Sequence, residues 1–170
     1  QLGHADGEAR FQRFLKTYPQ HRKAPLAYYQ LGNLYFTNQA FAKSIHYYLL
    51  VDQPQLDLET RQALQYALAY AYLSEKDFAQ ALQYFNSLKA QASRYRYAAN
   101  YYAGYLAFRN EDYETALKDL MEASQNEHYQ PVVPCLILQT YYKQKRFEEL
   151  RISFHHVRRN IFVRIFVYLS

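Results

Sequence analysis

The sequence has few of the residues that build loops, metal centres and membrane spans. Its 170 residues include four Gly, five Pro, one Cys and no Trp. So few Gly and Pro disfavour a disordered chain, and the single Cys135 excludes an internal disulfide and a cysteine-based zinc site. No apolar run reaches the roughly 18 residues that a membrane-spanning helix needs. The first residues, Gln1–His4, lack the charged and apolar start of a signal peptide. These absences favour one globular domain or a piece of a repeat array.

The net charge of +5 at pH 7 comes from one end of the sequence. Residues 1–130 contain 13 Lys or Arg and 13 Asp or Glu, whereas residues 131–170 contain seven and two. A groove that follows a phosphate backbone needs basic residues spread along its whole face. We therefore interpret the excess as a local basic end and disfavour nucleic acid as the partner.

Aromatic residues make up 18% of the chain and mark an internal repeat. Four segments align, and each has an aromatic residue ten positions after its start. The segments begin at Leu31, Leu68, Ala103 and Ile137, and the aromatic anchors are Phe41, Phe78, Tyr113 and Phe147. The anchors are 37, 35 and 34 residues apart. Apolar residues recur around them at three- and four-residue steps, which predicts two amphipathic helices in each repeat.

Small residues occupy two matching positions in the first three repeats. The first helices carry Gly32, Ala69 and Gly104, and the second helices carry Ser44, Ala81 and Ala116. Small residues at facing positions let two helices approach closely, while the aromatic anchors fill the space at the turn. The fourth repeat has Leu138 and Leu150 at these positions, so we expect its packing to differ most.

This pattern resembles the tetratricopeptide repeat (TPR), a helix–turn–helix unit of about 34 residues. The match is strongest over residues 25–55, where Leu31, Gly32, Phe41 and Tyr48 stand at family positions. The resemblance implies an all-α fold, a right-handed α-solenoid of antiparallel helix pairs, in one domain of residues 1–170. We expect a partial N-terminal unit and four further units, followed by an apolar C-terminal segment. Their bounds are about 5–19, 25–58, 62–93, 97–130, 131–160 and 161–170. The pattern starts in mid-repeat, which predicts a fragment of a longer chain.

In this family the first helices line a concave groove, and set positions point into it. Here those positions are rich in Tyr, which offers a large contact area at a low cost in side-chain entropy. The resemblance therefore implies a groove that binds a peptide or partner protein. Its residues would be Tyr29, Asn33, Phe36, Tyr66, Tyr70, Tyr101, Tyr102, Tyr105, Phe108, Arg109, Gln139 and Tyr142. The alternative is that these rings pack on one another between adjacent helices. Tyr28, Tyr35, Phe41 and Tyr48 are expected in the core.

The sequence contains no recognisable catalytic or cofactor motif. His155 and His156 would point about 100° apart on a helix, which disfavours a shared metal ion. Asp77, Glu111 and Asp112 fall in turns, where they suit helix caps. No Gly-rich phosphate loop, nucleophile elbow or HExxH motif occurs. We expect a protein that is not an enzyme and has no cofactor, no metal and no small-molecule substrate.

The expected function is a non-catalytic protein–protein interaction scaffold, and two alternatives stay open. One is a structural oligomerisation module that self-associates through Ile161–Leu169. The other is an anionic-surface or nucleic-acid binder that uses the basic C-terminal end. The basic residues there are Lys143, Lys145, Arg146, Arg151, Arg158, Arg159 and Arg164.

Two stretches of the sequence bear on the compartment. Residues 11–36 resemble bacterial envelope members of the TPR family, and residues 101–120 and 129–150 resemble the long repeat proteins of Bacteroidetes-type bacteria. That resemblance implies a periplasmic or cell-envelope location, while a cytoplasmic location stays open.

Overall fold

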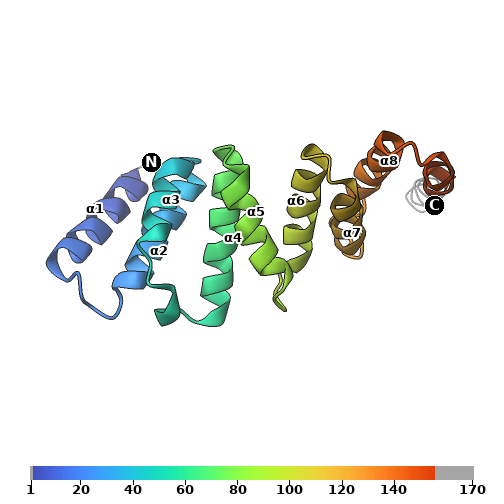
Figure 1. The fold of residues 1–170 in the computed structure, drawn as a ribbon. Helices are drawn as coiled ribbons and strands as arrows, with labels where there is room; N and C mark the ends of the chain where they lie inside the picture. Colours follow the sequence, from blue (N-terminus) through green and yellow to red (C-terminus); the bar gives the residue numbers. More distant parts are fainter. Residues whose placement is uncertain (1, 156–170) are drawn as a thin grey trace, which may run out of the picture. The chain divides into compact units, whose positions relative to one another are not determined.

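The computed structural model describes residues 2–155, which form α-helices, one short 3-10 helix and their connections (Figure 1). No strand occurs among these residues, so the expected all-α class is confirmed. The helices are α1 (Leu2–Thr17), α2 (Ala24–Thr37), α3 (Phe41–Leu49), the 3-10 helix η1 (Gln53–Gln55), α4 (Leu58–Ser74), α5 (Phe78–Lys89), α6 (Arg96–Arg109), α7 (Tyr113–Ala123) and α8 (Val133–Lys143). Residues 147–155 are also helical. The apolar segment 161–170 lies outside the described residues.

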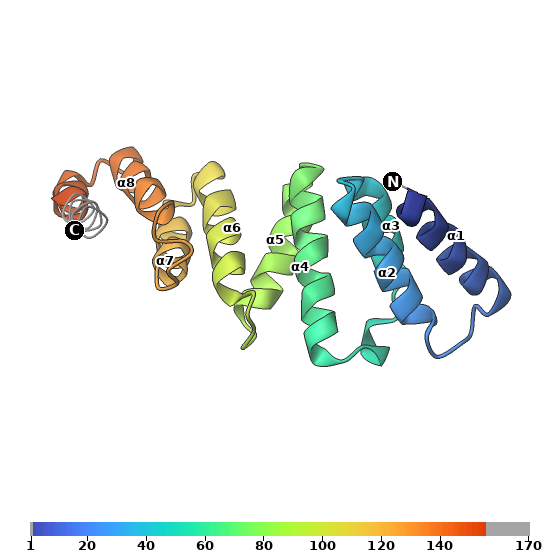
Figure 2. The same cartoon turned by 180° about the vertical axis from the view of Figure 1, so that it is seen from behind.

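The helices are grouped into two compact units, with the division after Tyr95. In unit 1, α2 packs against α3 and α4 packs against α5, and contacts of α1 with α2 and of α3 with α4 stack these elements. In unit 2, α6 packs against α7, and α8 contacts both. Figure 2 shows the same pairs from behind. Within each unit consecutive helices therefore pack as a helical repeat does. The division falls between the expected second and third repeats.

One turn geometry occurs four times and joins the two helices of each repeat. Its central residue has a positive φ of 58° at Gln39, 63° at Lys76, 61° at Glu111 and 58° at Lys145. In the first turn the amide of Gln39 donates to the Phe36 carbonyl at 2.9 Å, and the next amide, of Ala40, donates to Tyr35 at 2.9 Å. The other three turns have the same two bonds. This pair of bonds is the Schellman motif, which ends a helix and satisfies its last carbonyls. The four turns are spaced as the aromatic anchors are.

Aspartates begin three of the helices. The carboxylates of Asp77 and Asp112 each accept a bond from the backbone amide three residues later, at 3.2 Å. Asp57 caps α4 by accepting from the Thr60 amide at 2.9 Å and from its hydroxyl at 2.7 Å. These two bonds lower the pKa of the Asp57 carboxyl, and the bond from the Thr60 amide has the larger effect. The capping expected of Asp77 and Asp112 is confirmed, but Glu111 instead occupies the left-handed position of its turn.

The close approach of paired helices depends on a small residue that faces a large one. Gly32 on α2 lies against Tyr48 on α3, and a Cβ added to Gly32 would overlap the Tyr48 ring. In unit 2 a Cβ added to Gly104 would lie 2.9 Å from the Cγ atom of Leu120. Tyr48 and Leu120 are fully buried. Each side chain therefore fills the space that a missing Cβ leaves on the partner helix.

The fourth repeat departs from this arrangement. Leu138 and Leu150 are only half-buried, whereas the small residues at the same positions of the first three repeats are buried. Phe147 was expected to fill the turn, but 58% of it is exposed, and 55% of Phe154 is exposed. The equivalents of Phe154 in the other repeats have no exposed surface. Leucines stand at both small positions of this repeat, and the expectation that Phe147 fills the turn is wrong.

Glycine at a left-handed turn position should stabilise the folded chain. Lys76→Gly should raise the free energy of unfolding by about 0.5–1 kcal/mol. A positive φ costs an L-residue roughly 1–2 kcal/mol, and only part of that gain is lost to glycine's greater freedom in the unfolded chain. Urea unfolding followed by circular dichroism measures the change. Ala79→Gly, at an exposed position of α5, is the control and should cost about 1 kcal/mol. Equal losses in both variants would contradict the turn geometry.

The contact of Gly32 with Tyr48 predicts a severe effect of one methyl group. Gly32→Ala should lower the free energy of unfolding by about 3 kcal/mol, because overpacking in a filled core forces the helices apart. Gly7→Ala is the matched control, since a Cβ on Gly7 meets nothing within 4 Å. It should stabilise helix α1 by about 0.5–1 kcal/mol. Adding Tyr48→Leu to Gly32→Ala should recover part of the loss, and strictly additive losses would rule out the proposed clash.

Candidate functional site

Five of the twelve expected groove residues lie on α2 and α4 of unit 1, and all five are half-buried. They are Tyr29, Asn33, Phe36, Tyr66 and Tyr70. Each has contacts with other side chains of the unit, which the next three paragraphs describe. Their placement on first helices follows from the repeat, but their surroundings depend on residues from other elements.

Three rings from three helices meet near the first turn of unit 1. The ring centroids of Phe36 and Tyr70 lie 5.8 Å apart, and Phe41 lies 5.5 Å from Phe36 and 6.2 Å from Tyr70. The rings are tilted or edge-on to one another, which are favourable arrangements for aromatic pairs. Phe36 and Tyr70 therefore help to stack α4 on the pair formed by α2 and α3.

Two stacked tyrosine pairs occupy equivalent places in the two units. Tyr66 on α4 stacks on Tyr95 with centroids 4.7 Å apart and planes 20° apart. Tyr101 on α6 stacks on Tyr129 at 5.1 Å and 27°. Burial is the main cause of the raised pKa of Tyr129, and the neighbouring Tyr101 phenol is the second. Tyr95 and Tyr129 belong to the segments that connect repeats, and sequence reasoning missed them. Their spacing of 34 residues was the available signal.

The Asn33 side chain accepts a hydrogen bond from a buried residue of unit 1. The hydroxyl of Tyr48 donates to the Asn33 Oδ1 atom at 2.7 Å, and the Tyr48 side chain is fully buried. Burial raises the pKa of Tyr48. The ring of Tyr29 lies 6.1 Å from that of Tyr48. Asn33 and Tyr29 thus lie beside the core tyrosine, and Asn33 satisfies its hydroxyl.

The other seven expected groove residues lie on α6 and α8 of unit 2. On α6 they are Tyr101, Tyr102, Tyr105, Phe108 and Arg109, and on α8 they are Gln139 and Tyr142. Tyr101 also contacts Tyr102 at 5.1 Å, and Phe108 contacts Tyr113 at 5.9 Å. Tyr102 and Arg109 have further contacts within the chain. Four of these five α6 residues therefore have contacts with other residues of the chain.

Three residues of α6 and α8 stand apart from this packing. Tyr105 is half-buried, Gln139 is exposed, and 63% of Tyr142 is exposed. Among residues 2–155 none of the three side chains has a hydrogen bond or a ring partner. The two helices that carry them are in contact. We call these three residues the α6–α8 strip.

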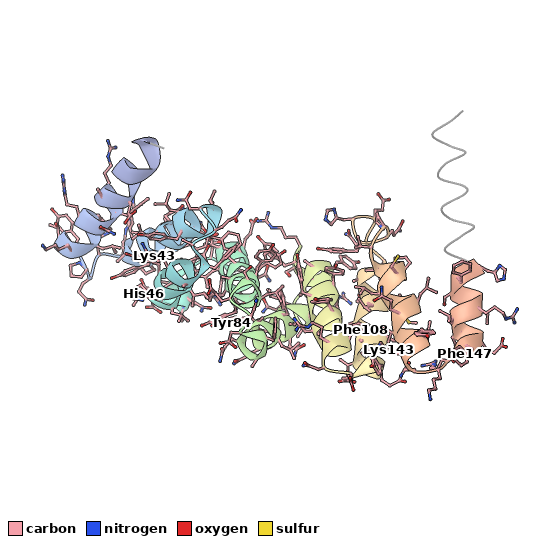
Figure 3. All side chains as sticks on the ribbon, turned by 90° about the horizontal axis from the view of Figure 1, so that it is seen from above. Lys43, His46, Tyr84, Phe108, Lys143 and Phe147 are labelled. Atoms are coloured by element: carbon pink, nitrogen blue, oxygen red, sulfur yellow. The ribbon has the colours of Figure 1, made fainter. Side chains whose placement is uncertain are left out.

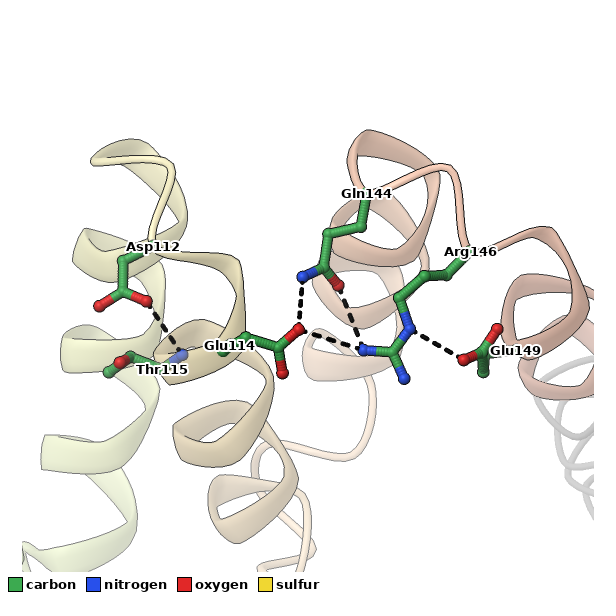
Figure 4. A network of polar contacts seen from close by, with 6 residues as sticks. All are labelled: Asp112, Glu114, Thr115, Gln144, Arg146 and Glu149. Carbon is green, nitrogen blue, oxygen red and sulfur yellow. Dashed lines mark hydrogen bonds and ion pairs between the residues drawn. The ribbon is translucent and has the colours of Figure 1, made fainter.

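A polar network ties α7 to the turn after α8 (Figure 4). The Glu114 Oε1 atom accepts from Gln144 Nε2 at 2.7 Å and from Arg146 Nη1 at 3.4 Å. Arg146 Nε also donates to Glu149 at 2.8 Å, and this bond is the first cause of the raised pKa of Arg146. Arg151 pairs with Glu148 at 2.9 Å. Two members of the basic end are thus bound to carboxylates of their own unit, whereas Lys143, in the same region, is exposed (Figure 3).

Two negative findings apply to the described part of the chain. Among residues 2–155 no three His, Cys, Asp or Glu side chains lie close enough together to hold a metal ion. In the same range every helix is too short or too polar to cross a bilayer. Of the His155-His156 pair, only the first residue is described.

No protein-family model matches this sequence, and a comparison with curated proteins finds no significant match. The resemblance to the tetratricopeptide repeat therefore depends on the repeat positions and on the turns that join the helices. The groove positions carried over from that resemblance stay predictions.

The bond between Asn33 and Tyr48 predicts a stability effect that a ligand-binding role alone would not give. Asn33→Ala should lower the free energy of unfolding by about 1–3 kcal/mol, because it leaves a buried hydroxyl without a partner. Tyr48→Phe in the Asn33→Ala background should restore most of this loss, because it removes the hydroxyl. Urea unfolding of both variants and of Tyr48→Phe alone completes the cycle. If Asn33→Ala unfolds like the native chain, the Asn33 side chain contributes nothing to the core.

Proposed function

We propose that this chain is a non-catalytic protein-interaction module of the tetratricopeptide-repeat type. Four turns with the same pair of hydrogen bonds recur at the spacing of the aromatic anchors. In the first three repeats a small residue of the first helix is buried. A module built from such repeats stays folded through contacts between neighbours, which leaves its first-helix surface available for a partner.

The binding surface that we propose in unit 2 is the α6–α8 strip. The observation that carries this proposal is that the side chains of Tyr105, Gln139 and Tyr142 have no hydrogen-bond or ring partners among the described residues. A tyrosine offers a large flat face and a hydroxyl, and a glutamine amide both donates and accepts hydrogen bonds. This combination suits an extended peptide, whose main chain has donors and acceptors and whose side chains pack against the rings.

In unit 1 the corresponding residues contact other side chains of the same unit. Tyr66, Tyr70 and Phe36 lie against other rings, and Asn33 is bonded to a core tyrosine. We propose that these residues hold the repeats together and that their exposed edges contribute less to binding. The partner would therefore depend more on α6 and α8 than on α2 and α4.

We propose no catalytic role, no cofactor and no small-molecule substrate. Within the described residues the strip contains no carboxylate, histidine or cysteine from which acid–base or nucleophilic chemistry could start. The Glu114 carboxylate, which lies at the turn after α8, is bonded to Gln144 and Arg146.

For the compartment, we propose the cell envelope of a bacterium, on the resemblance of residues 11–36 to bacterial envelope members of the TPR family and of residues 101–120 and 129–150 to the long repeat proteins of Bacteroidetes-type bacteria. The oligomerisation alternative depends on Ile161–Leu169, which lie outside the described residues. The ion pairs of Arg146 and Arg151 with glutamates weaken the nucleic-acid alternative.

The strip is tested by selecting peptides and then removing its side chains. A random peptide library displayed on phage is selected on the native chain, and the enriched peptides are titrated by isothermal calorimetry. Tyr105→Ala and Gln139→Ala should each weaken binding by about tenfold, a typical loss for a residue central to an interface. Tyr18→Ala removes an exposed ring from unit 1 and should leave the affinity unchanged. Enriched peptides that bind all three variants as they bind the native chain would exclude the strip as the binding surface.

A further inference from the structure

The helix of residues 147–155 exposes two aromatic side chains on one face. Phe147 and Phe154 are seven positions apart, which is about two helical turns, so they lie on the same side. Their exposed fractions are 58% and 55%. We call these two residues the terminal stripe. Large apolar side chains grouped on one exposed face mark an interaction surface more often than isolated ones do.

The first repeat shows what covers an equivalent face. The equivalents of the stripe are Phe41 and Tyr48 on α3. Tyr70 of α4 lies 6.2 Å from Phe41, and Leu64 and Leu68 of α4 form one buried cluster with Tyr48. Tyr48 has no exposed surface as a result. Leu64 and Leu68, four residues apart on one side of α4, thus cover the Tyr48 end of this face.

Two lysines that precede the helix of the terminal stripe in the sequence favour an acidic partner. Lys143 ends α8, and Lys145 lies in the turn before the helix of residues 147–155. Both side chains are exposed, and neither has an ion pair among residues 2–155. The nearby Arg146 and Arg151 pair with the two glutamates of the same helix. Two positive charges therefore remain without a counter-charge, and they favour acidic groups on whatever docks beside them.

We propose that the terminal stripe is a docking surface for an acidic amphipathic helix of another protein. A second copy of this chain would bring the same lysines face to face, and like charges across an interface are costly. Residues 156–170 contain three Arg and no acidic residue, so they match these lysines no better. The terminal stripe shares no residue with the α6–α8 strip, and the two proposals stand or fall separately.

The test uses two labelled synthetic peptides and the full chain. Both peptides carry leucines at the spacing of Leu64 and Leu68 on an alanine background, with Glu on the opposite face of one peptide and Lys at the same positions of the other. Fluorescence anisotropy should show the acidic peptide binding about tenfold more tightly at low salt, and this preference should shrink as salt screens the charges. Joint replacement of Lys143 and Lys145 by Glu should reverse the preference.

Substitutions in the terminal stripe complete the test. Phe147→Ala and Phe154→Ala should each weaken binding of the acidic peptide by about tenfold. Both residues are exposed, so circular dichroism should find both variants folded, and Tyr105→Ala should bind the peptide as the native chain does. The proposal is overturned if neither peptide binds or if both bind equally. It is also overturned if light scattering finds a dimer that Phe154→Ala dissociates, since a second copy would then occupy the face.

Discussion

The fold depends on one packing contact, in which a side chain of the second helix fills the space left by a small residue of the first. Gly32 with Tyr48 and Gly104 with Leu120 are the clearest cases. The large side chain is fully buried because the next first helix covers its other side, as Leu64 and Leu68 do for Tyr48. The contact thus joins the helices of one repeat and also provides the surface on which the next repeat packs. The fourth repeat has leucines at both small positions, and its two phenylalanines, Phe147 and Phe154, are exposed.

The aromatic residues that suggest a binding surface are divided between two roles. Tyr66 and Tyr101 each stack on a ring from the following connection, so their roles cannot be judged from the first helix alone. The contrast between Tyr70, which contacts two rings, and Tyr105, its equivalent in the next repeat, makes the same point. Whether a repeat-position tyrosine is free for a partner depends on the residues that neighbouring helices bring to it.

Several parts of the structure could be predicted from the sequence because they depend on local pattern. The spacing of the four anchors predicts the helix pairs, and the aspartates before α5 and α7 predict their caps. Other parts could not be predicted, because they depend on contacts between distant residues. The bond from Tyr48 to Asn33 and the stacking of Tyr95 on Tyr66 are of this kind. Phe147 shows the limit of the repeat pattern: the aromatic residue is at the repeat position, but 58% of it is exposed.

The four identical turns have a consequence for how this chain tolerates changes in length. Each turn between the helices of a repeat has three residues, whereas the connections between repeats have eight residues after α3, six after α5 and nine after α7. Both bonds of the Schellman motif span fixed numbers of residues, so an insertion there would rotate the second helix away from its small partner residue. The connections carry no such fixed count. Whole helix pairs are therefore the pieces that recombination could add or remove, with joints between the repeats and never within them.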